Sequence, residues 1–229
     1  VVCETDSDAI ANLETMNTNF GVEYSKVSES IWNSIVNASY DSNGDAKVGN
    51  VKYRRIKKGD ATHVMSGNDY NYNRNNYYNW KDADTYHYFR FEPIKWRVLS
   101  VNGNDIILLS DKGIDDQTYD KGQGPWETCT MRNWLNGYGT EYSSKNFINT
   151  AFTQSELSAI KTTEVTNGDD NSTSDKVCLL SGNEVYNSNT AFSYGFTKSD
   201  SKYDEGRRCK SSTYAKAMGV WSSTSSSYI

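Results

Sequence analysis

The stretch FRFEPIKWRVLSVNGNDIILLS, residues 89–110, carries the clearest structural signal in the sequence. Two apolar runs flank Asn-Gly-Asn-Asp at residues 102–105, and Asn-Gly between such runs is typical of a β-hairpin turn. In the first run Ile94, Trp96 and Val98 alternate with Lys95, Arg97 and Leu99. This period of two predicts a strand with Ile94, Trp96 and Val98 on its buried face. The second run, residues 106–109, is wholly aliphatic, so we expect it in the middle of a sheet, buried on both faces.

Other β-type segments lie before this hairpin. Residues 84–91 (DTYHYFRF) lead into it as a strand, and residues 48–56 (VGNVKYRRI) predict another. His87 stands between two tyrosines, where a packed strand residue is commoner than a catalytic base. Residues 41–45 (DSNGD) predict a tight turn, because the glycine falls too early for an EF-hand loop and no closing glutamate follows.

Helical spacing and capping residues predict short helices elsewhere. They span residues 7–16, 27–38, 128–136, 145–152, 153–160, 181–186 and 211–218. The expected caps are Ser28, either Thr128 or Thr130, and the capping boxes Thr153–Glu156 and Ser181–Glu184. Gly137 and Gly219 are the expected helix stops.

The order of these elements predicts an α+β fold with a mixed, mostly antiparallel sheet, short helices and long loops. Residues 162–166 and 175–180 add two short strands, the second of them buried. We expect residues 1–19 to form a leading helix or linker and residues 20–229 to form a single domain that lacks its final strands.

Composition excludes some functions. The chain has 229 residues and a net charge of −5 without a basic block, which argues against nucleic-acid binding. No run approaches the ~18 apolar residues of a membrane span, so membrane insertion is not expected. A start at Val1 without Met suggests a processed fragment, and the richness in Asn, Ser, Thr, Tyr and Gly favours an extracellular or cell-wall location.

The four cysteines are Cys3, Cys129, Cys178 and Cys209. No C-x-x-C pair occurs and the chain has only 2 His, so we expect no metal site and no cofactor. The four cysteines could form two disulfides, in any of three pairings. Cys209 is as compatible with a disulfide as with a free thiol. Cys129 and Cys178 stand among apolar neighbours and are expected to be buried free thiols.

Residues 66–80 (SGNDYNYNRNNYYNW) are rich in Asn and Tyr and poor in aliphatic residues. One interpretation is an exposed recognition loop, in which Tyr72, Tyr77, Tyr78 and Trp80 bind a ligand. The other is a surface loop whose rings lie down on the sheet.

A series of motifs follows in order after Phe89. They are EPIKWRVL, WETCTMRNWLN, AFTQSELSAI, DKVCLLSGNEV, YGF and TYAKAMG. This order resembles the bacterial family known as domain of unknown function 6273, and the likeness extends over most of the chain from about Phe20. The resemblance implies secreted or wall-anchored proteins of Gram-positive gut bacteria, often beside Ig-like or repeat modules.

The resemblance also implies a C-type-lectin-like core. Family members continue into a W-W-L-R-S-P-G segment and a closing strand that lie beyond Ile229, so we expect a partner segment to complete the fold. Family members more often have Ser where Cys129 stands, and no nucleophile role carries over to it.

Candidate chemistry is sparse. A lectin-type calcium–sugar site is rejected because Glu92-Pro93-Ile94 lacks the third residue of the triplet and no Trp-Asn-Asp follows. Carboxylates for acid–base catalysis would come from three residues: Glu127, Glu156 and Glu184. The last two already have capping roles, and the arginines Arg97 and Arg132 suit buried ion pairs or helix locking before substrate binding.

These observations predict a non-catalytic extracellular module for adhesion, which binds a glycan or a host or bacterial surface protein. Two alternatives stay open. One is a hydrolase whose site lies partly beyond residue 229. The other is a structural spacer of a surface assembly.

Overall fold

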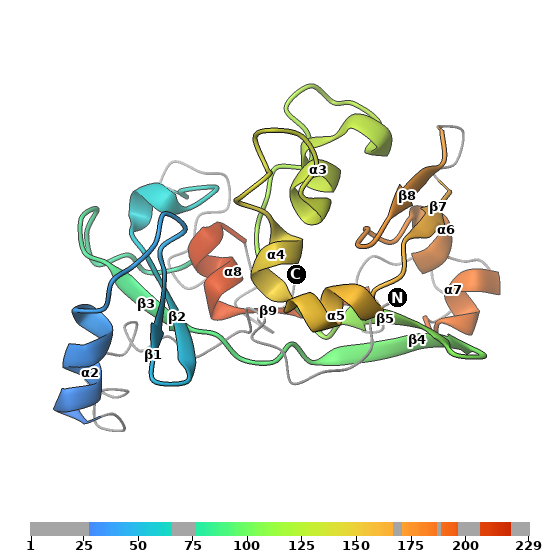
Figure 1. The fold of residues 1–229 in the computed structure, drawn as a ribbon. Helices are drawn as coiled ribbons and strands as arrows, with labels where there is room; N and C mark the ends of the chain where they lie inside the picture. Colours follow the sequence, from blue (N-terminus) through green and yellow to red (C-terminus); the bar gives the residue numbers. More distant parts are fainter. Residues whose placement is uncertain (1–27, 66–76, 167–170, 187–188, 197–206, 221–229) are drawn as a thin grey trace. The chain divides into compact units, whose positions relative to one another are not determined.

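The computed structural model describes residues 28–65, 77–166, 171–186, 189–196 and 207–220 (Figure 1). The chain divides into two compact units. The hairpin unit contains Lys95–Asp111 and the described residues between 117 and 209. The sheet unit contains the described residues between 28 and 94, Lys112–Asp116 and residues 210–220. The expected helix at residues 7–16, with the linker at 1–19, lies outside the described residues, and the single domain over 20–229 stays a prediction.

The sheet unit is built on three antiparallel strands in the order β1-β2-β3. Its elements are α2 (Glu29–Val36), β1 (Asp45–Val48), β2 (Val51–Ile56), η2 (Lys58–Asp60), β3 (His87–Arg90), β6 (Lys112–Gly113), β9 (Lys210–Ser211) and α8 (Thr213–Met218). Short strands β6 and β9 pair in parallel. The predicted strands at 48–56 and 84–91 are confirmed as β2 and β3, whereas β1 was not predicted.

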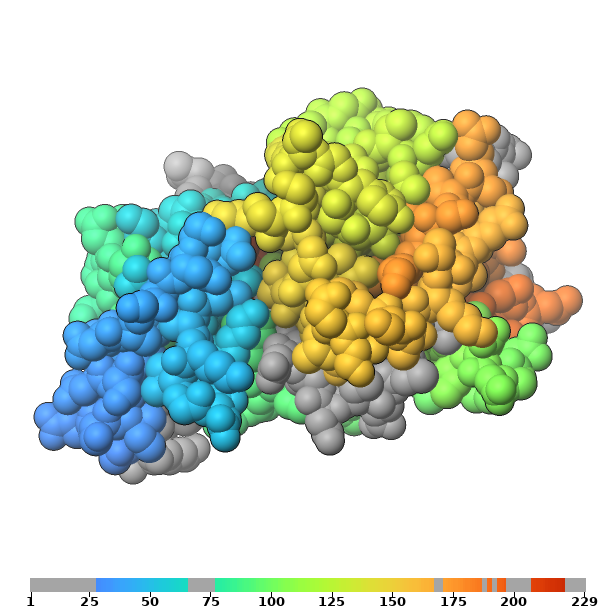
Figure 2. Space-filling model, viewed as in Figure 1, coloured from blue at the N-terminus to red at the C-terminus, as the bar shows by residue number. Residues whose placement is uncertain are grey.

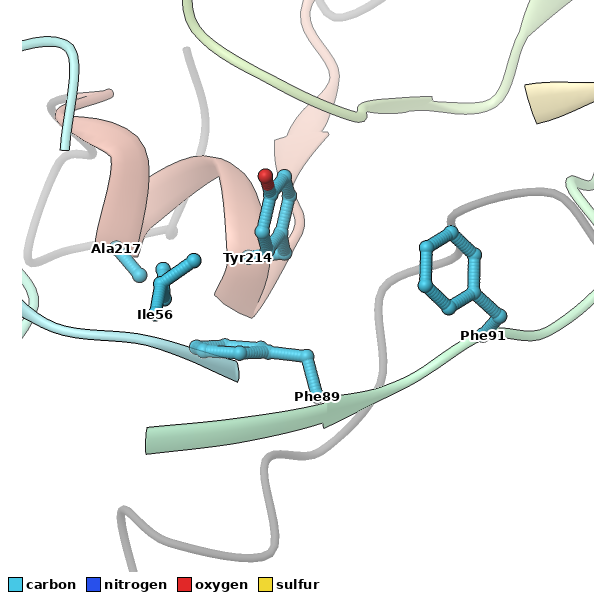
Figure 3. Packing of buried hydrophobic residues seen from close by; sticks show 5 residues of the cluster. All are labelled: Ile56, Phe89, Phe91, Tyr214 and Ala217. Atoms are coloured by element: carbon cyan, nitrogen blue, oxygen red, sulfur yellow. The ribbon is translucent and has the colours of Figure 1, made fainter. Parts of the chain in front are cut away.

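Both faces of this sheet are covered by helices. Tyr53 of β2 and Tyr88 of β3 pack with Ile35 of α2 on one face. On the other, Ile56 and Phe89 meet α8, as the side chains in Figure 3 show. Period-two alternation explains the split, because neighbouring residues of one strand point to opposite faces. In the space-filling view α2 and the β1–β2 hairpin form one continuous blue surface (Figure 2).

Local sequence fixes how these elements begin and end. Ser28 caps α2 as predicted, because its side chain accepts the N–H of Ile31. The tight turn at 41–45 is confirmed, since Asp41 Oδ1 accepts the N–H groups of Asn43 and Asp45 at 2.8 and 2.9 Å. Ser212 caps α8 by accepting the N–H of Ala215.

The hairpin unit contains β4 (Trp96–Asn102), β5 (Asp105–Ser110), η4 (Trp126–Thr128), α3 (Thr130–Asn136), α4 (Phe147–Ala151), α5 (Gln154–Ala159), β7 (Thr163–Val165), β8 (Thr173–Asp175), α6 (Gly182–Val185) and α7 (Asn189–Ser193). Strands β4 and β5 form the predicted antiparallel hairpin, with Gly103 at φ +59° in its turn. Trp96 stacks on Phe152, and the ring centroids are 6.1 Å apart.

The hairpin differs from the prediction on both strands. A register shift between Val98 and Ser100 turns Leu99 inward to 5% exposure and leaves Val98 55% exposed. Strand β5 is half-buried rather than enclosed, because among the described residues it pairs with β4 in a two-stranded sheet. Its Ile107 and Leu109 pack around Leu99 on the inner face.

The two capping boxes are confirmed, as are the short helix within 145–152 and the strand within 162–166. The predicted cap of α3 is wrong. Cys129 occupies the N-cap position, where its Sγ accepts the N–H of Arg132 at 3.4 Å, and neither Thr128 nor Thr130 does so. Gly137 ends this helix at φ +72°, as expected.

The predicted buried strand at 175–180 is also wrong, because β8 ends at Asp175. The side chain of Asn136 accepts the N–H groups of Lys176 and Val177 and donates to the carbonyl of Val177, so these backbone groups are not available to a strand ladder. Cys178 is therefore an exposed free thiol rather than a buried one, and Leu179 is 45% exposed. Cys129 is buried and free, as predicted.

The described residues form an α+β structure with small, mostly antiparallel sheets. No helix within the described ranges has the length and apolar character needed to cross a bilayer.

Candidate functional site

A pocket of about 300 Å³ opens in the sheet unit, on the α8 side of the sheet. Two loop segments and the end of α8 form its walls. The lining residues are His63, Met65, Tyr77, Tyr78, Asn79, Trp80, Lys216, Ala217 and Gly219. Three of the four predicted ligand-binding residues thus come together here, and the fourth, Tyr72, lies outside the described residues.

Backbone contacts hold the first loop against the helix end. The N–H of His63 donates to the carbonyl of Met218 at 3.0 Å, and Thr62 Oγ1 donates to the carbonyl of Asp116 at 2.9 Å. Gly219, which follows Met218, has a backbone φ of +130°, a conformation that residues with a side chain rarely adopt. These contacts set the position of His63 at the pocket edge.

The aromatic wall is fixed by the sheet beneath it. The Tyr78 hydroxyl lies 2.7 Å from Nδ1 of His87, and the Tyr78 ring meets the Trp80 ring at a centroid distance of 4.8 Å. Both rings pack against the core cluster around Phe89. His87 is a buried strand residue, as predicted, and burial lowers its pKa. In the described part of the loop, the rings of Tyr78 and Trp80 lie on the sheet and also line a pocket, whereas ligand binding by this loop stays a prediction.

Polar side chains lie at or beside the same pocket. His63 Nδ1 lies 2.5 Å from Asp116 Oδ2, while Lys216 comes from the last turn of α8. Burial lowers the pKa of Lys216. Sequence reasoning missed His63, Asp116 and Lys216, because no local pattern joins residues so far apart along the chain. The only signal was the predicted helix stop at Gly219.

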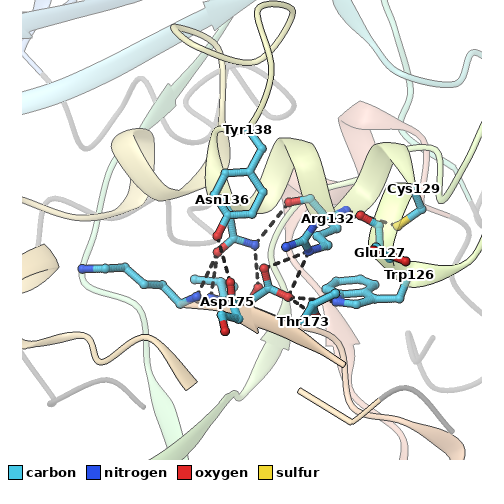
Figure 4. Close-up of polar contacts among 11 residues, drawn as sticks. Trp126, Glu127, Cys129, Arg132, Asn136, Tyr138, Thr173 and Asp175 are labelled. Atoms are coloured by element: carbon cyan, nitrogen blue, oxygen red, sulfur yellow. Dashed lines mark hydrogen bonds and ion pairs between the residues drawn. The ribbon is translucent and has the colours of Figure 1, made fainter. Parts of the chain in front are cut away.

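A buried charge network occupies the hairpin unit (Figure 4). Asp175 accepts hydrogen bonds from Trp126 Nε1 at 3.0 Å and from Thr173 Oγ1 at 2.7 Å. Arg132 Nε approaches its two oxygens at 2.9 and 3.1 Å. Asp175 is 2% exposed, and its oxygens are bound by side chains of the protein itself, so the network joins η4 and α3 to β8.

The sequence profile of a family described as a domain of unknown function (DUF6273) matches residues 103–228, more than half of the chain. The chain belongs to the DUF6273 family. In this DUF6273 chain the matched region includes β5, the Asp175 network and α8. No curated protein and no solved structure matches the chain. The C-type-lectin-like core expected for the DUF6273 chain is not confirmed.

The other chemical candidates of the DUF6273 chain have structural contacts. Glu156 and Glu184 close their capping boxes, and Glu127 accepts from Asn171 Nδ2 at 2.9 Å. Arg97 donates to the carbonyls of Tyr194 and Gly195, while Arg132 forms the predicted buried ion pair. Within the described ranges, no group of three His, Cys, Asp or Glu side chains is placed to hold a metal ion.

Stability of the sheet unit should depend on Asp115. Burial raises the pKa of this half-buried carboxyl to about 7, although the N–H of Asp116 and the charge of Arg54 act in the opposite direction. A pKa raised above its unfolded value means that the folded state binds the proton more tightly, so stability is lost as pH rises from about 4 to about 7.

We therefore expect Asp115→Asn to stabilise the protein progressively over this range, by on the order of 4 kcal/mol above pH 7 and by little at pH 4. Urea unfolding at a series of pH values measures the difference from wild type. A difference that does not change with pH would show that Asp115 carries no such penalty.

Proposed function

We propose that the chain is an extracellular, non-catalytic binding or adhesion module of a bacterial surface protein, and that the pocket of the sheet unit receives part of a carbohydrate or protein ligand. The observation that carries the proposal is the convergence of Tyr77, Tyr78 and Trp80 on one concave site beside His63 and Lys216. Three of the nine lining residues are aromatic, and polar groups form much of the remaining wall. Aromatic side chains beside placed polar groups occur in ligand sites.

The pocket is small and its wall is held in place. Its volume of about 300 Å³ lies at the lower end of the ~300–1,000 Å³ seen for ligand pockets. The contacts of Tyr78 with His87 and Trp80 hold the rings in position before a ligand arrives. Binding to such a wall avoids much of the ordering cost that a flexible loop would incur.

The proposal also includes the fold of the core and the location of the protein. A C-type-lectin-like core is what the resemblance implies, and the Asn, Ser, Thr and Tyr content supports an extracellular or cell-wall location. The described α+β elements are compatible with such a core.

Arrays of glycans and bacterial or host surface proteins provide the test. We expect wild type to bind a ligand and Trp80→Ala to weaken that binding by roughly tenfold or more, because truncating an aromatic anchor removes a central contact. Tyr86→Ala is the matched control, since Tyr86 is an exposed aromatic of the same unit that does not line the pocket. Equal binding by Trp80→Ala and wild type would contradict the pocket as the site.

A hydrolase is the second candidate function, and one observation favours it. The contact between His63 and Asp116 is the arrangement in which a carboxylate orients an imidazole that acts as a general base. Turnover of a glycan or peptide that His63→Gln abolishes would establish this function over simple binding. A structural spacer is the third, and it predicts that Trp80→Ala changes neither binding nor turnover.

A further inference from the structure

Lys216 is the one lysine that lines the pocket, as far as the structure describes it. Its side chain is half-buried at the end of α8, and burial lowers its pKa. None of the ion pairs among the described residues includes Lys216. A partly desolvated ammonium without a counter-charge costs free energy that a bound anion would offset.

The nearby carboxylate is already engaged. Asp116 Oδ2 lies 2.5 Å from His63 Nδ1, and the backbone of Asp116 accepts from Thr62 Oγ1. Asp116 is thus in contact with the His63 ring at the pocket, and none of the ion pairs among the described residues joins Asp116 to Lys216. A ligand that complements this site carries one negative charge and a face that packs against aromatic rings.

We infer that the ligand is an acidic saccharide, in which a uronic or sialic acid residue places its carboxylate on Lys216 and its ring against Tyr77 and Trp80. This inference rests on the proposed function. A carboxylate–ammonium hydrogen bond supplies orientation as well as affinity. Asn79, which is exposed and lines the pocket, offers an amide donor and acceptor for sugar hydroxyls. The pocket volume suits one ring rather than a chain of them.

Calorimetric titration of the full chain tests this with matched saccharides. The probes are trigalacturonic acid, its methyl ester, 3′-sialyllactose and lactose, and the two acids distinguish a uronic from a sialic source. We expect at least one acid to bind roughly tenfold or more tightly than its neutral partner. Lys216→Met should remove this preference while binding of the neutral saccharide persists.

Two variants serve as controls. Lys216→Arg keeps the charge and should retain part of the preference, whereas Lys47→Met removes an exposed lysine of β1 and should leave the preference intact. Thermal unfolding of each variant checks that it is folded.

The outcomes separate the inference from the proposed function. Equal affinity for acidic and neutral saccharides, unchanged in Lys216→Met, would overturn the acidic-ligand inference and leave a binding pocket in place. Binding of a peptide with neither acid bound would overturn it as well. If wild type binds no glycan or protein on the arrays, and Trp80→Ala gives the same array signals as wild type, the proposed function is instead overturned.

Discussion

Replacing Asp175 with alanine is expected to lower the free energy of unfolding of the hairpin unit by about 3–5 kcal/mol. The change removes the acceptor of Trp126 Nε1, Thr173 Oγ1 and Arg132 Nε at once. Arg132 keeps its charge, but its side chain is only 16% exposed, so the variant holds a buried guanidinium without its counter-ion. Urea unfolding monitored by tryptophan fluorescence measures the loss.

A surface pair in the same unit gives the matched control. Asp111 lies 3.4 Å from Lys95, and the two side chains are 40% and 80% exposed. Because exposed pairs contribute only about 0–1 kcal/mol, Asp111→Ala should change stability little. The double variant Arg132→Met/Asp175→Leu should recover part of the loss, since it leaves no unpaired charge. Equal losses for Asp111→Ala and Asp175→Ala would contradict a structural role for the network.

Gly219→Ala is expected to destabilise the sheet unit by about 3 kcal/mol. The residue has φ +130°, and a Cβ there would lie 2.7 Å from His63 Cβ and 2.8 Å from the His63 carbonyl oxygen. Backbone cannot yield to such a contact as a flexible side chain can. We therefore expect the loop that carries His63 to move away from α8, with loss of ligand binding.

Gly49→Ala separates backbone conformation from crowding. Gly49 has φ +62° in the β1–β2 turn, and nothing lies within 4 Å of a Cβ placed on it. This variant should cost only the left-handed penalty of roughly 1–2 kcal/mol. Chemical denaturation of the two variants compares them directly. If Gly219→Ala is as stable as Gly49→Ala, the backbone of residue 219 lies farther from His63 than the structure shows.

Local patterns in the sequence predicted local structure well. The spacing of Thr153 with Glu156 and of Ser181 with Glu184 specifies capping boxes without help from the rest of the chain. The Asn-Gly turn and the glycine stops worked for the same reason, because each depends on the conformation of a few neighbouring residues.

The errors occurred where a distant group decides the local structure. The side chain of Asn136 forms hydrogen bonds with backbone groups of Lys176 and Val177. Nothing in the sequence of residues 175–180 indicates these bonds. The bulge beside Leu99 likewise exchanges the inward and outward faces of β4, which period two alone does not predict.

The candidate site was found in part. Its aromatic residues cluster within residues 77–80 and stood out in composition, whereas the polar side of the pocket comes from positions near 63, 116 and 216. The last two segments are brought together by the pairing of β6 with β9 and by Ser212, the N-cap of α8, whose Oγ donates to the carbonyl of Ile114. That pairing is long-range, so a single sequence does not show it.

Resonances of the tryptophan indole N–H groups test the pocket most directly. In a titration of the isotope-labelled full chain with the acidic saccharide that binds, the account predicts that the Trp80 indole signal shifts with a saturating dependence on ligand. The signal of Trp126, which donates to Asp175 in the hairpin unit, should stay unchanged. Saturable binding that leaves the Trp80 signal in place would contradict the assignment of this pocket as the binding site.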